Sequence, residues 1–226
     1  FNMHMAVVGP LMESPLVAAA TRKRVSDMVV HGKRLISGNS SEPTTSGLVG
    51  TPVPLTRARR VDGGYRITGR KAFASMVDAA DYTAVLAYPD ESTLPTAAMI
   101  LLVPQGAPGR RIDPVWDTLG MRATRSDSML LDDCFVPDES LMVRADNIVP
   151  FRRDSANWSW ASYTAVYLGV GVAAYRALID TVRGRTPPGF SQSLAYHPDV
   201  RRHGAAMRVD LGGAPKNVIA IAAGVV

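Results

Sequence analysis

Along the chain, the spacing of apolar residues changes twice, from helical to strand-like and back to helical. No proline interrupts residues 17–36, and the apolar side chains there keep roughly to one face. Residues 1–36 are therefore predicted to be helical, with Pro15 at a helix start. From Ser37 onward, the turn formers of GNSSEPTTSG predict a loop.

Residues 48–143 are predicted to be rich in β-strands. GYRITGR alternates polar and apolar residues between glycines, as a half-buried strand does. DYTAVLAY, AAMILLVP and SMLLDDCFVP contain short apolar runs bounded by Asp or Pro, which are typical of well-buried strands. No helical pattern separates these strands, which favours an antiparallel barrel or sandwich over a doubly wound sheet.

Helical spacing returns over residues 158–182, where apolar residues recur every three or four positions until GRTPPGF ends the helix. Residues 198–214 predict a second helix that Pro198 opens, and KNVIAIAAGVV predicts a third helical piece. A helix, a strand block and further helices in this order predict an α+β fold with segregated layers.

Composition narrows the classes of function. Hydrophobic residues make up 46% and charged residues 20% of the chain, as in ordinary soluble globular proteins. The net charge is +5, but the basic clusters are scattered and have no interleaved aromatic residues, which disfavours nucleic acid. Steering of an anionic ligand, such as a nucleotide cofactor or a CoA ester, stays an alternative, and solvated surface explains most of the clusters. The single cysteine, Cys134, excludes an intrachain disulfide and favours a cytoplasmic location. No apolar run approaches the ~18–20 residues of a transmembrane helix, so no membrane span is expected.

Two patterns that could carry chemistry are rejected. Gly169, Gly171 and Ala174 spell G-x-G-x-x-A, but they lie inside a helical period without the strands that a dinucleotide-binding turn needs. These glycines are interpreted as packing residues. The four histidines lack the spacing of metal ligands, and no G-x-S-x-G nucleophile elbow occurs, so neither a metal site nor a hydrolase is predicted.

Four segments in a fixed order carry the strongest signal. They are GNSSEP (38–43), GYRITGRKAFAS (64–75), WDTLGMRATRSDSMLLDDCFVP (116–137) and YLGVGVAAYRALIDTVRGR (167–185). At these residues the chain resembles the acyl-CoA dehydrogenase superfamily, and the third segment is close to that family's W-D-x-L-G-M-R-A-T-x-S.

The resemblance implies an acyl-CoA dehydrogenase-like arrangement of three regions in a chain truncated at both ends. Residues 1–36 would end an N-terminal helical domain. Residues 37–143 would form the middle, flavin-binding β-domain, a central antiparallel barrel or sandwich. Residues 144–226 would begin a C-terminal helical-bundle domain.

The resemblance also implies FAD as the cofactor and places five residues at its ring. Ser41 stands for the Thr of the family's T-E-P turn, and the backbone of Ser40 faces the ring. Phe73 takes the place of the aromatic wall, Ser75 brings a hydroxyl near flavin N5, and Ala74 lies between them. A flavin edge needs such hydroxyl and backbone groups beside a flat wall. Each residue taken alone is more often a turn former or a core residue.

Arg185 is the sixth residue implied to bind the cofactor. In the family, an Arg after the long helix reaches across a subunit interface to the FAD pyrophosphate, which its planar fork suits. A cation at a helix C-terminus is the alternative and compatible role. In the third segment, Trp116, Leu119 and Met121 are predicted to pack and Arg122 to make a polar contact.

The implied activity is that of an oxidoreductase that dehydrogenates an acyl-CoA thioester. A carboxylate removes the α-proton while the β-hydrogen leaves as hydride to flavin N5. In most members that base comes from the C-terminal helical domain, and Ser159 stands where some members place a catalytic Glu, so no base is assigned.

Two alternatives stay open. One is a flavin-dependent monooxygenase of the same superfamily, and the other is a non-catalytic subunit of a mixed oligomer. The expected partners are an acyl-CoA or similar small substrate, an acceptor protein such as an electron-transfer flavoprotein, and further copies of the chain in a dimer or tetramer.

Overall fold

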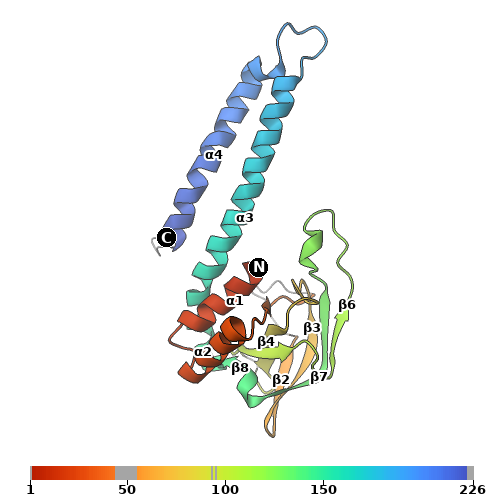
Figure 1. Cartoon of the computed structure of the whole chain (residues 1–226), viewed down its shortest axis with the longest axis vertical. Helices are drawn as coiled ribbons and strands as arrows, with labels where there is room; N and C mark the ends of the chain where they lie inside the picture. Colours follow the sequence, from red (N-terminus) through yellow and green to blue (C-terminus); the bar gives the residue numbers. More distant parts are fainter. Residues whose placement is uncertain (1, 44–54, 93, 95, 223–226) are drawn as a thin grey trace. The chain divides into compact units, whose positions relative to one another are not determined.

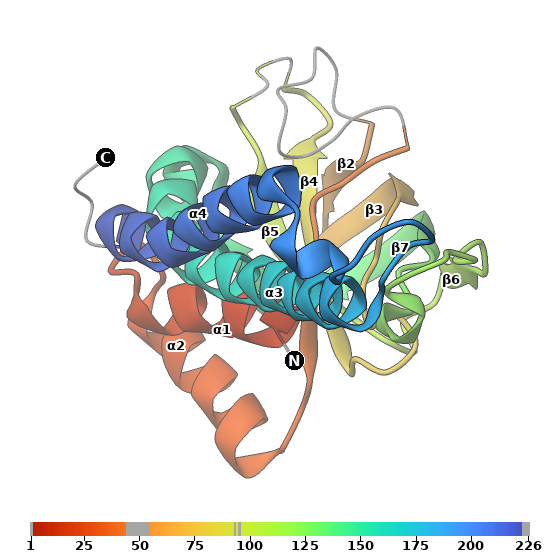
Figure 2. The same cartoon turned by 90° about the horizontal axis from the view of Figure 1, so that it is seen from above.

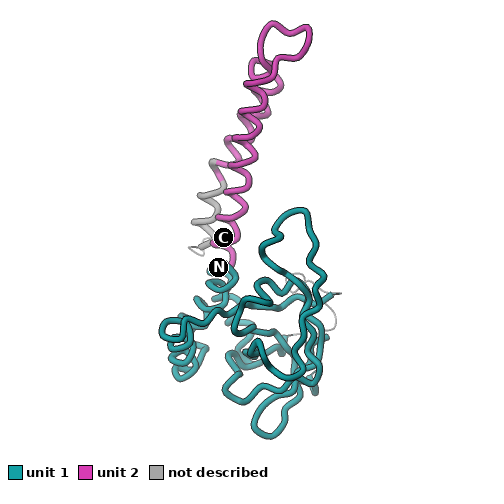
Figure 3. The backbone as a smooth tube through the Cα atoms, turned by 45° about the vertical axis from the view of Figure 1, so that its right-hand side comes forward, with its two compact units in different colours: residues 1–158 teal, residues 159–226 magenta. Residues whose placement is uncertain are grey.

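The computed structural model describes residues 2–43, 55–92, 94 and 96–222, with the backbone alone for residues 212 and 214–222. The chain divides into two compact units, residues 1–158 and residues 159–226 (Figure 3). The three regions implied by the resemblance stay a prediction, since a division by compactness does not test them.

Unit 1 begins with two helices, α1 (Asn2–Glu13) and α2 (Ala19–Ser26), and a π-helical turn over Asp27–His31 follows α2. The helical prediction for residues 1–36 is confirmed over residues 2–13 and 19–31, but residues 32–35 are not helical, Ile36 begins a strand, and the start at Pro15 is wrong. Pro15 lies in the turn between the helices, while Pro10 lies inside α1. His4 is buried in α1, and its Nδ1 accepts a hydrogen bond of 2.9 Å from the backbone N–H of Ile36, which ties the helix to the sheet.

The strands of unit 1 form one sheet in the order β6-β7-β3-β2-β4-β5-β8, with β1 paired to β4 (Figure 1). The α+β class and the four strands predicted from sequence are confirmed. The pairing differs in one respect, because β4 runs parallel to both β1 and β2. The bounds are β1 Ile36–Asn39, β2 Arg57–Val61, β3 Gly64–Lys71, β4 Tyr82–Pro89, β5 Met99–Pro104, β6 Arg110–Asp113, β7 Ser128–Pro137 and β8 Leu141–Val143.

Strands β4 and β5 are buried on both faces, which explains their continuous apolar sequences. In β4, Val85 belongs to one hydrophobic cluster and Leu86 to another, because successive side chains point to opposite faces. The second cluster also contains Leu11 of α1 and Val25 of α2. Figures 1 and 2 show these two helices on one side of the sheet, away from β6 and β7.

A glycine in α1 gives room to a tryptophan of α3. A Cβ at Gly9 would lie 2.3 Å from the nearest indole atom of Trp158, closer than side chains pack. We expect Gly9→Ala to lower the free energy of unfolding by about 1–3 kcal/mol, the usual cost of overpacking. Urea denaturation checks this. Gly169→Ala is the matched control, since a Cβ there meets open space and helix propensity favours Ala by up to about 1 kcal/mol. Equal stability of the two variants would contradict the described packing.

Unit 2 contains most of α3 (Ile148–Gly184) and all of α4 (Pro198–Ala222). The predicted helix over 158–182 lies inside α3, and GRTPPGF ends it as expected. The separate third helical piece is wrong, because α4 continues through Pro215 to Ala222. A proline removes one helical hydrogen bond but does not always end a helix. Short 3₁₀ turns cover Arg122–Thr124, Asp138–Ser140, Ala145–Asn147 and Leu194–Tyr196.

The glycines of α3 differ in their surroundings. A Cβ at Gly171 would lie 2.7 Å from a methyl group of Leu211 in α4, as expected of a packing glycine, whereas one at Gly169 would meet nothing. By length and composition alone, the stretch 145–184 could also cross a membrane, which the sequence patterns did not anticipate. Core helices of soluble proteins have the same composition, so the absence of a membrane span stays a prediction.

Candidate functional site

Three loops of unit 1 meet at one end of strands β1, β3 and β7. Three backbone hydrogen bonds join them, from Ala72 to Ser41 (3.0 Å), from Ala74 to Asp127 (2.9 Å) and from Met76 to Thr124 (2.8 Å). The meeting follows from the pairing, because antiparallel register puts the end of β3 beside the beginning of β7. Segments that the sequence predicted to share one ligand therefore lie together.

The five predicted ring-contacting residues of these loops differ in exposure. Ser40 is exposed and Ser41 is half-buried. Phe73 is 63% exposed, and its ring meets that of Trp116 edge to face at a centroid distance of 6.2 Å. The side chain of Ala74 is buried. Of these residues, Phe73 and Ser40 are the ones exposed to solvent.

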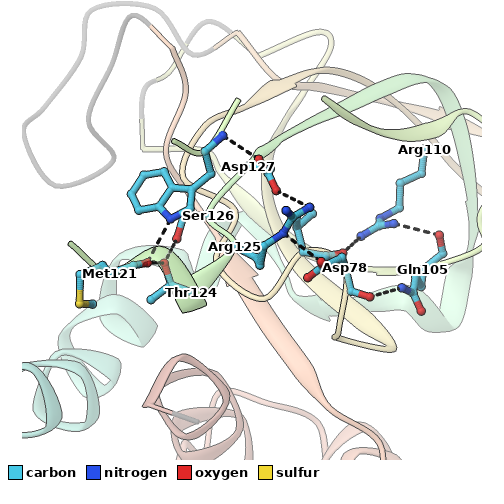
Figure 4. Close-up of polar contacts among 10 residues, drawn as sticks. Asp78, Gln105, Arg110, Met121, Thr124, Arg125, Ser126 and Asp127 are labelled. Atoms are coloured by element: carbon cyan, nitrogen blue, oxygen red, sulfur yellow. Dashed lines mark hydrogen bonds and ion pairs between the residues drawn. The ribbon is translucent and has the colours of Figure 1, made fainter. Parts of the chain in front are cut away.

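Ser75 differs from its neighbours because its hydroxyl turns inward. Its Oγ lies 2.8 Å from Ser126 Oγ, which lies 2.8 Å from Thr124 Oγ1. Figure 4 shows Thr124 and Ser126 side by side with Met121. The two inner hydroxyls belong to the motif W-D-x-L-G-M-R-A-T-x-S, but the motif alone does not reveal their link to Ser75.

The backbone is strained where the loops meet. Phe73, Met76, Met121 and Arg125 have φ angles of 54°, 62°, 58° and 45°. Side chains other than glycine rarely adopt this left-handed conformation, which costs free energy and persists mostly where function requires it. The described part of the chain contains six such non-glycine residues, and these four lie in the loop after β3 and in the loop before β7.

The loop of the third segment offers apolar side chains to solvent. Leu119 and Met121 were predicted to pack, but Leu119 is fully exposed and Met121 is 65% exposed, so that prediction is wrong for both. They protrude because hydrogen bonds within the loop close it, including one of 3.1 Å from Trp116 Nε1 to the carbonyl of Met121. The predicted polar contact of Arg122 is confirmed, since it pairs with Asp117 at 3.0 Å.

A buried aspartate holds this loop to the sheet. Asp127 Oδ1 accepts a hydrogen bond of 2.7 Å from the backbone N–H of Trp116. Its Oδ2 lies 3.1 Å from Arg125 Nη2, in an ion pair without the alignment of a hydrogen bond. Arg125 also reaches Asp78 at 3.1 Å (Figure 4). No pattern in the sequence singled out Asp127.

A buried ion pair lies behind the loop of residues 40–43. Lys71 Nζ is 3.1 Å from Glu42 Oε1, and both side chains are almost completely buried. Burial lowers the pKa of Lys71 to about 8, against the opposing effect of Glu42. Burial alone would raise the pKa of Glu42, but Lys71 and the backbone N–H groups of Leu55 and Thr56 outweigh it and lower that pKa. Both groups are charged at neutral pH.

The sixth predicted residue, Arg185, lies in unit 2 directly after α3 and is exposed. Its backbone carbonyl accepts a hydrogen bond of 2.9 Å from Leu194, which closes the turn to the next helix. The fold brings the other five residues together, while the contact of Arg185 with the cofactor stays a prediction.

Unit 2 also contains a cavity of about 610 Å³ between α3 and α4. Apolar side chains such as Val182 line it, together with Arg183, Arg201 and Arg208. None of the six predicted cofactor-binding residues lines this cavity, so it is a feature separate from the three-loop site. In the described part of the chain, no group of His, Cys, Asp and Glu has the arrangement of a metal site.

Comparison with known proteins identifies the region that forms the three-loop site. The family described as "Acyl-CoA dehydrogenase, middle domain" matches residues 39–134. The cyclohexane-1-carbonyl-CoA dehydrogenase of Geobacter metallireducens is 26% identical over 201 residues, covering 88% of this chain and 52% of that protein. The oxygenase component of the FADH(2)-dependent resorcinol hydroxylase of a Rhizobium species is 36% identical over 101 residues, 44% of this chain and 24% of that one.

The fold matches solved structures over almost its whole length. Butyryl-CoA dehydrogenase from Megasphaera elsdenii superposes with a TM-score of 0.82 at 18% identity, covering 98% of this chain and 57% of that one. The chain thus spans about half the length of the relatives and structures it matches.

Proposed function

Because this chain belongs to the acyl-CoA dehydrogenase superfamily, we propose that its three-loop site binds the ring of FAD for oxidoreduction of an organic substrate. One observation carries the proposal, namely the meeting of strained, exposed and hydroxyl-bearing positions in the loops around Ser41, Phe73 and Ser75. Bound FAD would supply the hydride acceptor or the oxygen-reactive ring, and the protein would supply its binding and orientation.

The residues present fit a flavin ring. The exposed side chains of Phe73 and Met121 offer apolar surface of the kind that a flat ring covers. Ser40 and Ser41 bring a hydroxyl and backbone groups to the neighbouring loop, and the Ser75 hydroxyl borders the same surface. Flavin-binding sites need apolar walls with a few placed polar groups.

The first candidate reaction is α,β-dehydrogenation of an acyl-CoA thioester, in line with the dehydrogenases among the relatives. It requires a carboxylate base. Asp78 and Asp127, the carboxylates beside Arg125, are poor candidates because both are held in ion pairs with this arginine. We therefore assign no base to unit 1.

The second candidate reaction is monooxygenation with reduced flavin and oxygen. The resorcinol hydroxylase among the relatives is named as FADH(2)-dependent. Other relatives of at least 30% identity are named as a monooxygenase and as a nitrososynthase. A flavoprotein subunit without catalysis remains the third possibility.

The flavin assignment predicts that the purified protein binds FAD and that Arg185→Glu weakens this binding about 10- to 100-fold. A charged hydrogen bond contributes about 1.5–3 kcal/mol, and each 1.4 kcal/mol corresponds to a factor of ten. Titration of the apoprotein with FAD, followed by flavin absorption, gives the affinity. Arg176→Glu, on the helix that Arg185 follows, is the matched control and is expected to leave the affinity unchanged.

A protein that takes up no FAD would overturn the proposed function, and an unchanged affinity in Arg185→Glu would remove Arg185 from the site. Substrate tests then separate the reactions. Anaerobic bleaching of bound FAD by an acyl-CoA supports dehydrogenation. Oxygen-dependent consumption of an aromatic substrate with supplied reduced flavin supports monooxygenation. A flavoprotein inactive in both assays supports the non-catalytic subunit.

A further inference from the structure

Three hydroxyl groups form a chain that ends on a backbone carbonyl. Ser75 Oγ lies 2.8 Å from Ser126 Oγ, Ser126 Oγ lies 2.8 Å from Thr124 Oγ1, and Thr124 Oγ1 lies 2.8 Å from the carbonyl oxygen of Met121. Ser126 is buried, so its hydroxyl has little access to water. The hydroxyl chain links the backbone at Met121 to Ser75, which borders the proposed flavin surface.

The carbonyl oxygen of Met121 sets the direction of every hydrogen bond in the hydroxyl chain. A carbonyl oxygen only accepts, whereas a hydroxyl donates one hydrogen and accepts through its lone pairs. Thr124 must therefore donate to Met121, which leaves its oxygen to accept from Ser126. Ser126 has then used its hydrogen and accepts from Ser75.

The opposite direction would bring lone pairs together. If Thr124 donated to Ser126, its oxygen would face the oxygen of Met121 at 2.8 Å with no hydrogen between them. The carbonyl of Met121 is fixed in place, because it also accepts from Trp116 Nε1 and from the backbone N–H of Thr124, each at 3.1 Å. The inward direction is thus the favourable one.

From this direction we infer that Ser75 presents a hydrogen-bond acceptor to the cofactor and that the site prefers reduced flavin over oxidised flavin. The inference rests on the proposed function and on the position near flavin N5 that the family resemblance implies for the Ser75 hydroxyl. The oxidised ring has a lone pair at N5, which would face the lone pairs of Ser75. The reduced ring carries a hydrogen at N5, which Ser75 can accept. Ser126 and Thr124 are positioning residues that act through Ser75.

This preference has consequences for both candidate reactions. A monooxygenase that receives its flavin already reduced gains selectivity for that form. In a dehydrogenase, the same preference raises the reduction potential of the bound flavin and favours hydride transfer to it. The hydroxyl chain therefore tunes the redox state of the cofactor in either case.

The test compares the affinities of the protein for FAD and for FADH₂ without any substrate. Both titrations are anaerobic, and the two-electron potential of the bound flavin is measured against redox dyes. We expect FADH₂ to bind at least tenfold more tightly, which corresponds to a potential about 30 mV above that of free FAD. Ser126→Ala and Thr124→Val each break the row of hydroxyl groups, so that Ser75 can turn its hydrogen toward the flavin. The ratio of the affinity for FADH₂ to the affinity for FAD should therefore fall three- to tenfold.

Thr164→Val is the matched control, because Thr164 donates to a carbonyl within α3 at 2.7 Å and lies outside the hydroxyl chain. It should keep the wild-type ratio. Binding of both flavin forms with equal affinity, or tighter binding of FAD, would overturn the inference and leave the proposed function intact. An unchanged ratio in both folded chain variants would also overturn it. Binding of neither form would overturn the proposed function and the inference together.

Discussion

Replacing Lys71 by methionine is expected to lower the free energy of unfolding by about 3–5 kcal/mol, the usual cost of removing one partner of a buried ion pair. The Lys71 side chain has no exposed surface, and its ammonium group lies 3.1 Å from Glu42. Without it, the carboxylate of Glu42 stays buried and loses the positive charge nearest to it. That carboxylate cannot easily turn to solvent, because it also accepts hydrogen bonds of 2.8 Å from the backbone N–H groups of Leu55 and Thr56.

Urea denaturation of the wild type and of Lys71→Met measures this loss. The double variant Lys71→Met, Glu42→Gln is the control, since a neutral amide at position 42 carries no buried charge and its oxygen can still accept one of the two backbone hydrogen bonds. We expect it to be more stable than Lys71→Met alone. A loss below about 1 kcal/mol in the single variant would match a solvent-exposed pair and would contradict the described burial.

The effect of Lys71→Met should also depend on pH in a definite direction. In the wild type the pKa of Glu42 lies below its ordinary value, so the stability that this group contributes is lost as the pH falls through that pKa. In the variant, loss of the Lys71 charge raises the pKa of Glu42 relative to the wild type. The carboxyl of Glu42 therefore becomes neutral at a higher pH than in the wild type. The difference in stability between the two proteins should therefore shrink as the pH falls from 7 to 4.

The strands that could be predicted from the sequence are those whose own side chains are apolar enough to be buried. β4 and β5 are apolar on both faces, and their continuous apolar runs identify them. β1, with the sequence ISGN, and β6, with RRID, are short and polar, so their strand structure depends on pairing with neighbours. Turn-forming residues in β1 predicted a loop because the partner strand β4 is far away in the sequence.

The meeting of the candidate site residues was predictable where an ordered motif contains them. Ser41, Phe73 and Ser75 follow from ordered segments, and the fold places them together. The pair of Glu42 and Lys71 was not predicted, because a glutamate in a turn and a lysine at a strand end are usually exposed. Their burial depends on a contact across 29 residues that no local pattern encodes.

Replacing Asp127 by alanine is expected to lower the free energy of unfolding by about 2–4 kcal/mol and to weaken FAD binding at least tenfold. Hydrogen bonds to charged groups contribute about 1.5–3 kcal/mol, and the variant also leaves Arg125 without one of its two carboxylates. The carboxylate of Asp127 fixes the backbone at Trp116, whose ring packs against Phe73. Loss of that anchor frees the loop that borders the proposed flavin surface.

Asp127→Asn separates the two roles of this side chain. Its amide oxygen can still accept the 2.7 Å hydrogen bond from Trp116, while the ion pair with the half-exposed Arg125 is lost. Since such an ion pair contributes about 0–1 kcal/mol, we expect this variant to stay within about 1 kcal/mol of the wild type and to bind FAD almost normally. If Asp127→Asn were as unstable as Asp127→Ala, the ion pair and not the backbone hydrogen bond would hold the loop. If Asp127→Ala lost stability but kept its affinity for FAD, the ordered loop around Trp116 would not be part of the flavin site.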